Sequence, residues 1–309
     1  MHVIAITFVQ YCTFFFFTYI STSLHFSQSG EDCRAIILTG AGSVAFTSGL
    51  DITDPSLLQP DHDDDADADH AGEYTQNPDS DPDIARMGVA KLFPKIIAMQ
   101  RCFTQIEKCP IPVIAAINGL CLGGGMDLAS VCDVRICSGE AKFAVREVCV
   151  GLAADVGTLQ RLPIITGNDS RVRELCYTGE IFTATEALEL GFVSRICGAG
   201  RNSHGAQQHP NTTTTSTTTA LMTEALALAI KIAANSPLAV MGTKRSLVYS
   251  RDHSVAEGLH HIATHNALAL MTQDIPLVIR SSSKKGGKGI ASNKKMMPKF
   301  TRIPKFSKL

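Results

Sequence analysis

Short apolar runs alternate along the chain with segments in which apolar residues recur every three or four positions. Arg34–Leu38 and Ile111–Ile117 are short, apolar and bounded by turn residues, which is typical of buried strands. Asp133–Cys137 and Phe143–Val145 fit shorter strands. Helical spacing marks four further segments: Ile84–Ile106, Met126–Cys132, Thr223–Ala234 and Val255–Met271. This alternation predicts the α/β fold class.

Residues 1–32 form an atypical apolar N-terminal segment. Val3–Ile20 is almost wholly apolar and, at 18 residues, just reaches the length of a membrane span. A secretory signal would need a basic residue before it, but the first one is Arg34. His2–Phe8 alternates well enough to predict one strand.

Two insertions and a tail interrupt the pattern. Residues 56–82 hold an acidic run, and residues 198–219 end in a Thr/Ser run, so both are expected to be solvated insertions. The acidic run does not fit an EF-hand, because His70 stands where that loop requires glycine. Residues 276–309 are predicted to be a basic flexible tail.

Composition and charge exclude several classes of protein. Hydrophobic residues make up 45% and charged residues 18%, so the chain can bury a core and wholesale disorder is excluded. The net charge of -1 hides an asymmetry, because ten Lys/Arg and no Asp/Glu follow position 279. The remainder holds 18 basic against 29 acidic residues, so no nucleic-acid partner is expected. Ten cysteines without a CxxC pair indicate free thiols and no zinc site, and no metal is predicted.

A glycine-rich turn after the first buried strand fits a dinucleotide-binding fingerprint only in part. Gly40–Ala45 matches G-x-G-x-x-A, but that motif needs a helix directly after it to hold the pyrophosphate. Phe46–Asp51 is poor helix sequence, and Pro55 follows closely. We therefore predict no nicotinamide cofactor.

Two other loops indicate a different kind of chemistry. Phe46–Asp51 and Leu122–Asp127 each follow a buried strand and place glycine where backbone N–H groups could be bare. Two such groups aimed at one point would bind a carbonyl oxygen that becomes negative during a reaction, with each donor contributing roughly 3 kcal/mol. The alternative is that the glycines only allow close packing of helix and strand.

Three longer runs carry a resemblance to a known family. Cys33–Asp51 (CRAIILTGAGSVAFTSGLD), Pro110–Asp133 (PIPVIAAINGLCLGGGMDLASVCD) and Phe143–Leu162 (FAVREVCVGLAADVGTLQRL) resemble the enoyl-CoA hydratase/isomerase (crotonase) superfamily. Within it they are most similar to the Δ3,5-Δ2,4-dienoyl-CoA isomerases, and Arg251–Glu257 and Phe306–Leu309 agree with the same subfamily.

The resemblance implies a crotonase-like ββα spiral core in a catalytic domain spanning residues 33–275, followed by a C-terminal helical oligomerisation region. It also implies a homotrimer that pairs into a homohexamer. The family's first strand and helix have no recognisable counterpart before Cys33. This departure from the family pattern is expected to affect the stability of the domain more than its catalytic chemistry.

By resemblance, the oxyanion hole consists of the backbone N–H groups of Leu50 and Gly124. The neighbouring residues would bind the acyl-CoA thioester. They are Gly49, Leu50, Asp51, Ile52, Thr53 and Gly125. Coenzyme A would be part of the substrate, and the resemblance implies no other cofactor.

Three carboxylates fall on catalytic positions of the family: Asp127, Glu147 and Asp155. The third separates the dienoyl isomerases from plain hydratases, which carry a small residue there. Shifting a 3,5-diene into conjugation removes a proton from C2 and adds one at C6, which suits two acids along the acyl chain. The resemblance makes Asp155 the base, Glu147 the acid and Asp127 a supporting group. Burial beside Val148, Val150 and Leu152 is expected to raise carboxyl pKa values.

These features predict an isomerase of unsaturated fatty-acid β-oxidation that converts 3,5-dienoyl-CoA to 2,4-dienoyl-CoA. Ser307-Lys308-Leu309 is the tripeptide that the peroxisomal import receptor reads, so a peroxisomal location is expected. A mitochondrial pool is also compatible with the family. Two alternatives stay open, namely an enoyl-CoA hydratase and a non-catalytic acyl-CoA-binding member.

Overall fold

A five-stranded parallel sheet forms the centre of the molecule. The computed structural model describes residues 2–8, 33–49, 88–198 and 214–283. The sheet has the order β1-β2-β4-β6-β9, with these bounds: β1 His2–Phe8, β2 Cys33–Gly40, β4 Val113–Ile117, β6 Val134–Ser138 and β9 Ile196–Cys197. All four pairings are parallel, which confirms the predicted α/β class.

The first strand corrects one expectation drawn from the sequence. His2–Phe8 is a strand as predicted, and it pairs in parallel with β2 along its whole length, from His2 to Phe8. Residues 2–8 thus belong to the same sheet as the folded domain, and a first strand is present before Cys33. Residues 9–32, which hold the rest of the apolar stretch, lie outside the described residues.

A second sheet stands beside the first and carries the glycine loops. Its order is β3-β5-β7-β8, with the bounds β3 Ala45–Thr47, β5 Leu120–Leu122, β7 Lys142–Ala144 and β8 Phe182–Thr183. The turn after β2 leads into β3 and not into a helix, which agrees with the rejection of the dinucleotide fingerprint. Because β3 and β5 are neighbours, the loops that follow them leave the sheet side by side.

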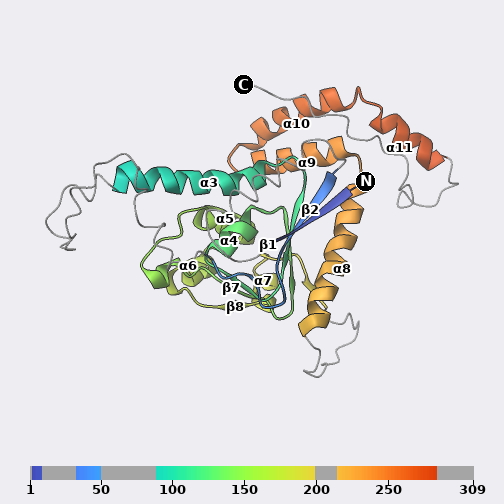
Figure 1. Cartoon of the computed structure of the whole chain (residues 1–309). Coiled ribbons are helices and arrows are strands. Elements are labelled where there is room, and N and C mark those ends of the chain that lie inside the picture. The colour runs from blue at the N-terminus through green and yellow to red at the C-terminus, as the bar shows by residue number, and fades with distance from the viewer. Residues whose placement is uncertain (1, 9–32, 50–87, 199–213, 284–309) are drawn as a thin grey trace, which may run out of the picture.

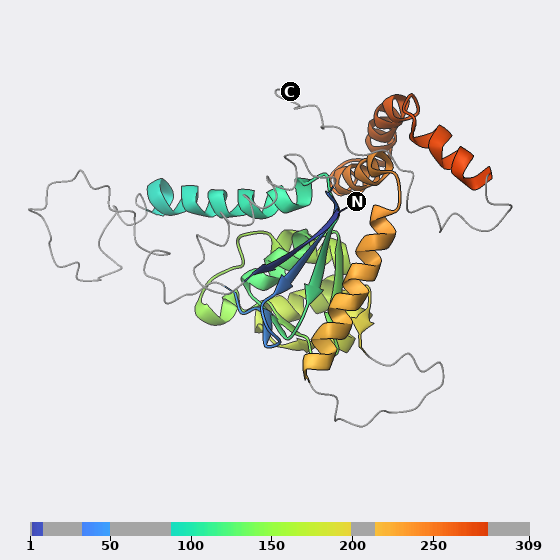
Figure 2. The same cartoon turned by 45° about the vertical axis from the view of Figure 1, so that its right-hand side comes forward.

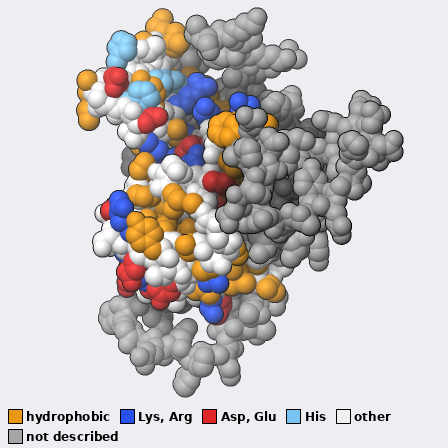
Figure 3. Space-filling model, turned by 90° about the vertical axis from the view of Figure 1, so that its left-hand side faces the viewer, with side chains coloured by type: hydrophobic (Ala, Val, Ile, Leu, Met, Phe, Trp, Pro, Cys, Tyr) orange, Lys and Arg blue, Asp and Glu red, His pale blue; other side chains and the backbone are white. Residues whose placement is uncertain are grey.

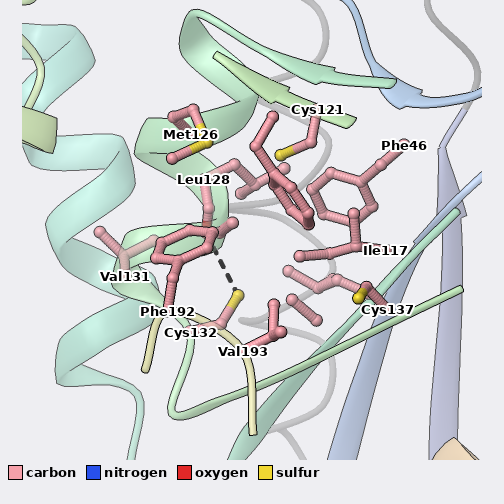
Figure 4. Close-up of a cluster of buried hydrophobic side chains, with 14 of the residues drawn as sticks. Phe46, Ile117, Cys121, Met126, Leu128, Val131, Cys132, Cys137, Phe192 and Val193 are labelled. Carbon is pink, nitrogen blue, oxygen red and sulfur yellow. Dashed lines mark hydrogen bonds between the residues drawn. The ribbon is translucent and has the colours of Figure 1, made fainter. Parts of the chain in front are cut away.

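The strands of the first sheet are buried on both faces, as in other parallel sheets covered by helices. Ala35 and Ile37 of β2 pack toward α8 (Thr214–Ala233), whereas Ile36 and Leu38 pack into the main core. Figures 1 and 2 show α8 lying along one face of the sheet. Figure 4 shows the core on the other face, where Phe46, Ile117, Met126 and Phe192 meet.

The remaining helices surround the second sheet or follow α8. Their bounds are α3 Phe93–Lys108, α4 Gly124–Val131, α5 Thr158–Thr166, α6 Asp169–Thr178, α7 Ala184–Glu189, α9 Pro237–Tyr249, α10 Val255–Ala269 and α11 Asp274–Ser283. A π-helical turn, Gly88–Leu92, precedes α3, and a 3-10 turn, Glu147–Val150, follows β7. Figures 1 and 2 show α10 and α11 projecting beyond the body.

Two predicted boundaries need correction. The second insertion was expected to run to residue 219, but α8 begins at Thr214, so the end of the Thr/Ser run is helical. The tail was expected to be flexible from residue 276, but α11 continues to Ser283. In α8 the polar residues extend a helix whose later turns pack against the sheet through Leu221, Ala225 and Ala229. The first insertion, residues 56–82, lies outside the described residues.

A buried ion pair joins the C-terminal helices to the body. Lys244 of α9 is almost fully buried, and its Nζ lies 2.7 Å from Asp133 Oδ2. The same ammonium group donates to the carbonyl oxygens of Ile106 and Ile111. Asp133 Oδ2 also accepts from the Val113 N–H at 2.7 Å. All three ammonium protons of Lys244 can therefore be satisfied without water.

None of the cysteines within the described ranges forms a disulfide, as predicted, and most of them are buried. In those ranges, no single helix is both long and apolar enough to cross a membrane. Only α8 and α9 taken together, across a bend of 106°, reach that length and composition.

Candidate active site

The two glycine loops predicted from the sequence meet at the edge of the second sheet. Gly49 follows β3 with a φ of 97°, and a Cβ placed there would lie 3.1 Å from the Leu122 carbonyl oxygen and 3.5 Å from the Gly124 nitrogen. A Cβ on Gly125 would lie 2.7 Å from the Thr47 Cγ2. Side chains at Gly49 and Gly125 would therefore force the loops apart.

Helix α4 begins at the meeting point of these loops. Gly123, with a φ of 51°, is its N-cap, so Gly124 provides the first N–H of the helix, which has no acceptor within the helix. The positive end of the helix dipole adds to this donor. Gly124 thus has the position that an oxyanion-hole donor requires. Its predicted partner Leu50 lies outside the described residues, as do Asp51, Ile52 and Thr53.

Glu147 lies directly against the glycine loop. A Cβ on Gly123 would lie 3.0 Å from the Glu147 Oε1, so glycine is required for this approach. The Oε2 atom is buried and has no hydrogen-bond partner. Burial raises the pKa of Glu147, and the negative charges of Asp127 and Asp155 raise it further. Each of these effects makes Glu147 a weaker acid than a solvated glutamic acid.

Asp127 is the most buried of the three carboxylates, with 1% of its surface exposed. Its Oδ1 accepts from the Thr158 N–H at 2.6 Å and from the Thr158 hydroxyl at 2.7 Å. Its Oδ2 is buried without a hydrogen-bond partner. Burial raises the pKa of Asp127, and the two bonds from Thr158 work against this rise.

Asp155 lies in the loop between the 3-10 turn and α5, and it is the most exposed of the three. Its neighbours Ala154 and Val156 are buried in the main core, so the side chain of Asp155 points outward between two anchored residues. The Asp155 carbonyl oxygen accepts from the Gln100 Nε2 at 2.6 Å. Burial raises the pKa of Asp155. Asp155 also lines a pocket of about 710 Å³ between α3, α5 and α9.

The structure brings Asp127, Glu147 and Asp155 into one electrostatic cluster, since the charges of Asp127 and Asp155 both act on Glu147. The predicted rise of all three pKa values agrees with their burial. The predicted cause was wrong, because Val148, Val150 and Leu152 are exposed. These three residues lie in the 3-10 turn or just after it, with their side chains toward solvent. Other residues of the core therefore bury the carboxylates.

Sequence reasoning assigned no role to Gln100 or Thr158. Thr158 stands in the run Phe143–Leu162 that carried the resemblance, and its place three residues after Asp155 is the only signal that could have identified it. Gln100 faces the loop from a separate helix, so no local pattern connects the two. Within the described ranges, no group of His, Cys, Asp and Glu could hold a metal ion.

Comparison with known proteins gives consistent matches. Residues 95–272 match the family model described as enoyl-CoA hydratase/isomerase. The chain is 44% identical to the mitochondrial Δ3,5-Δ2,4-dienoyl-CoA isomerase of Rattus norvegicus, over 85% of this chain and 70% of that protein. It is 38% identical to the peroxisomal Δ3,5-Δ2,4-dienoyl-CoA isomerase of Arabidopsis thaliana, over 84% of this chain and 80% of that protein.

A solved structure supports the same conclusion about the fold. The crystal structure of the enoyl-CoA hydratase of Bacillus anthracis has a TM-score of 0.69 to this chain at 25% identity, and the match covers 92% of this chain and 93% of that one. The predicted crotonase-like fold is thereby confirmed.

Proposed function

Because the chain belongs to the enoyl-CoA hydratase/isomerase family, we propose that it converts 3,5-dienoyl-CoA to 2,4-dienoyl-CoA in unsaturated fatty-acid β-oxidation. The observation that carries this proposal is the third carboxylate. Asp155 acts electrostatically on Glu147, beside the loop that presents the Gly124 N–H. A hydratase needs only two carboxylates and a water molecule, whereas moving a proton from C2 to C6 needs an acid and a base at separate points along the chain.

The reaction follows from these groups. The Asp155 carboxylate takes a proton from C2, and the electron pair of that C–H bond moves into a conjugated trienolate, whose oxygen accepts from the N–H groups of Gly124 and Leu50. The carboxyl group of Glu147 then gives its proton to C6, and the thioester carbonyl re-forms. Asp155 is left protonated and Glu147 ionised, so a proton must return between them or through water before the next turnover.

The environments of the two carboxylates suit these roles. Burial and nearby negative charge raise the pKa of Glu147, which favours the protonated acid. Asp155 is exposed toward a pocket, where water can carry its proton away after each turnover. Asp127 is held by Thr158 and is best suited to a supporting role.

The proposed partners are an acyl-CoA thioester and other copies of the chain. The first follows from the family. A homotrimer or homohexamer is supported by the apolar side chains that α10 and the turn after it expose, among them Val255, Leu259, Leu268 and Met271. Exposed apolar residues in such number on one helix are typical of an interface.

The proposed location is the peroxisome, with a mitochondrial pool also in keeping with the relatives. The relative in Arabidopsis thaliana is named peroxisomal and that in Rattus norvegicus mitochondrial. The terminal Ser307-Lys308-Leu309, which lies outside the described residues, supports recognition by the peroxisomal import receptor. Deleting this tripeptide should leave catalysis intact and move the protein to the cytosol.

The proposal is tested with two substrates. A 3,5-dienoyl-CoA should be converted to a product with strong conjugated-diene absorbance, and a 2-enoyl-CoA should be hydrated much more slowly. Faster turnover of the 2-enoyl-CoA would favour a hydratase. Coenzyme A binding without turnover of either substrate would favour the non-catalytic alternative.

A further inference from the structure

Two residues outside the three carboxylates hold the loop that carries Asp155. We propose that Gln100 and Thr158 are positioning residues for this base, with Thr158 acting through Asp127. The inference rests on the proposed function, because it assigns a role to the surroundings of the proposed base. It also gives Asp127 a definite task, namely to anchor the far end of the Asp155 loop.

The anchor at the far end of the loop is a pair of short hydrogen bonds. Thr158 is the first residue of α5, and its N–H and hydroxyl both donate to Asp127 Oδ1. The N-cap Gly157 has no side chain that could accept the first N–H groups of the helix. Asp127, which belongs to α4, therefore caps α5 from across the core and ties the start of α5 to the helix that presents the Gly124 N–H.

The second anchor acts on the peptide group of Asp155 itself. The Gln100 Nε2 donates to the Asp155 carbonyl oxygen at 2.6 Å from the middle of α3. Ala154 and Val156 bury their side chains on either side, which fixes the position of the chain. Their packing alone leaves the peptide plane between them free to rotate, and the bond from Gln100 fixes that plane.

The loop needs such anchors because its own backbone is permissive. Residues 152–155 form no regular structure, and the loop is bounded by Gly151 with a φ of 82° and Gly157 with a φ of 132°. Both values lie in the region that glycine enters without strain. Since a displacement of about 1 Å can lower catalysis about 100-fold, the orientation of Asp155 depends on the contacts at the two ends of the loop.

The test compares Gln100→Leu and Thr158→Val with Gln105→Leu, which changes an exposed residue of α3 that does not line the pocket beside Asp155. With a 3,5-dienoyl-CoA, each anchor variant should lose about 10-fold to 100-fold in kcat, with KM changed less than about twofold. The apparent pKa of the acid limb of the pH–rate profile should change in both anchor variants. Thr158→Ser, which keeps the hydroxyl, should recover most of the loss. Gln105→Leu should match the wild type.

Three outcomes would overturn the inference. They are wild-type kcat in both anchor variants, a loss confined to KM, and a loss of kcat that appears only together with a lowered unfolding temperature and an unmoved pH profile. If Thr158→Val does not fold, Gln100→Leu on the surface of α3 still decides the question.

A second readout separates this inference from the proposed function. The Asp155 carboxyl can be titrated by carbon NMR in the absence of substrate, and its pKa should differ between wild type and Gln100→Leu but not between wild type and Gln105→Leu. If the wild type does not isomerise the dienoyl-CoA, the proposed function fails, while this titration still tests the anchors. An unchanged titration in Gln100→Leu would overturn the positioning role.

Discussion

The body of the molecule and its C-terminal helices differ in how far their apolar side chains are buried. In the body, the strands β2 and β4 are buried along their whole length, and helices cover both faces of the sheet. In α10, no residue is buried, and several large apolar side chains are exposed. The body thus buries its apolar side chains within one chain, whereas α10 leaves apolar side chains exposed, as the proposed interface between copies of the chain requires.

The two regions also differ in their polar groups. Apart from His2 in β1, the described histidines all lie between residues 253 and 265, and Figure 3 shows histidine side chains gathered at the end of the molecule formed by α9 and α10. The rings of His253 and His261 both stack on the ring of Tyr249, with centroid distances of 3.6 Å and 4.2 Å. The titratable groups of the proposed chemistry are instead carboxylates inside the body. The two regions meet at the pocket beside Asp155, which Tyr249 of α9 and His253 line together with residues of α3 and α5.

The largest effect is expected from closing the glycine loop of the body. Gly124→Val places a branched side chain where the thioester must approach, so turnover should fall by at least about 100-fold while the fold is kept. Gly139→Ala is the control, because a Cβ there meets only Ile196 at 3.9 Å. Steady-state kinetics and circular dichroism of both variants provide the measurement. Normal turnover by Gly124→Val would remove this loop from the site.

The buried ion pair between Lys244 and Asp133 connects the two regions, and its loss should lower the free energy of unfolding strongly. Lys244→Met leaves Asp133 buried without its cation, so the free energy of unfolding should fall by about 3–5 kcal/mol. Lys231→Met on the exposed side of α8 is the matched control and should change this free energy by less than about 0.5 kcal/mol. Urea unfolding measures both. Equal stabilities of the two variants would show that the ion pair does not hold α9 to the body.

A smaller effect is expected on assembly when α10 is made polar. Leu259→Glu should weaken self-association by at least about 10-fold, because a charge would be buried in the proposed interface. Leu226→Glu, at an exposed position of α8, should leave the association state unchanged. Light scattering across a range of concentrations measures the change. If only Leu226→Glu dissociates the assembly, the interface lies on α8 and the contrast between body and C-terminal helices is wrong.

The smallest effect concerns pH. Burial raises the pKa of Asp155 above its ordinary value of 3.8, and the base works only when ionised. In a plot of kcat/KM against pH, the acid limb should therefore have an apparent pKa above 3.8. The same rise means that the folded state binds protons more readily than the unfolded state, so the contribution of this group to stability grows as pH falls through its folded pKa. In Asp155→Asn that contribution should vanish from the pH dependence of urea unfolding.

Much of the body could be predicted from the sequence, because its apolar runs and glycines each have one good structural interpretation. The strands at Arg34–Leu38 and Ile111–Ile117 and the helix after the triple glycine were found where expected. The pairing of β1 with β2 was missed, since parallel strands join residues that are distant in sequence. The bonds from Gln100 and Thr158 were missed for the same reason, because each connects different elements of the fold.

The roles of the carboxylates are tested most directly by the rates of Asp155→Asn on two substrates. Asparagine keeps the size of the side chain but cannot accept the C2 proton, so isomerisation of a 3,5-dienoyl-CoA should fall by about 10²–10⁴-fold while coenzyme A binding changes little. Glu147→Gln should be similarly impaired, and Asp127→Asn less so. Hydration of a 2-enoyl-CoA should be affected little by Asp155→Asn. Full isomerase activity in Asp155→Asn would contradict the assignment of Asp155 as the base.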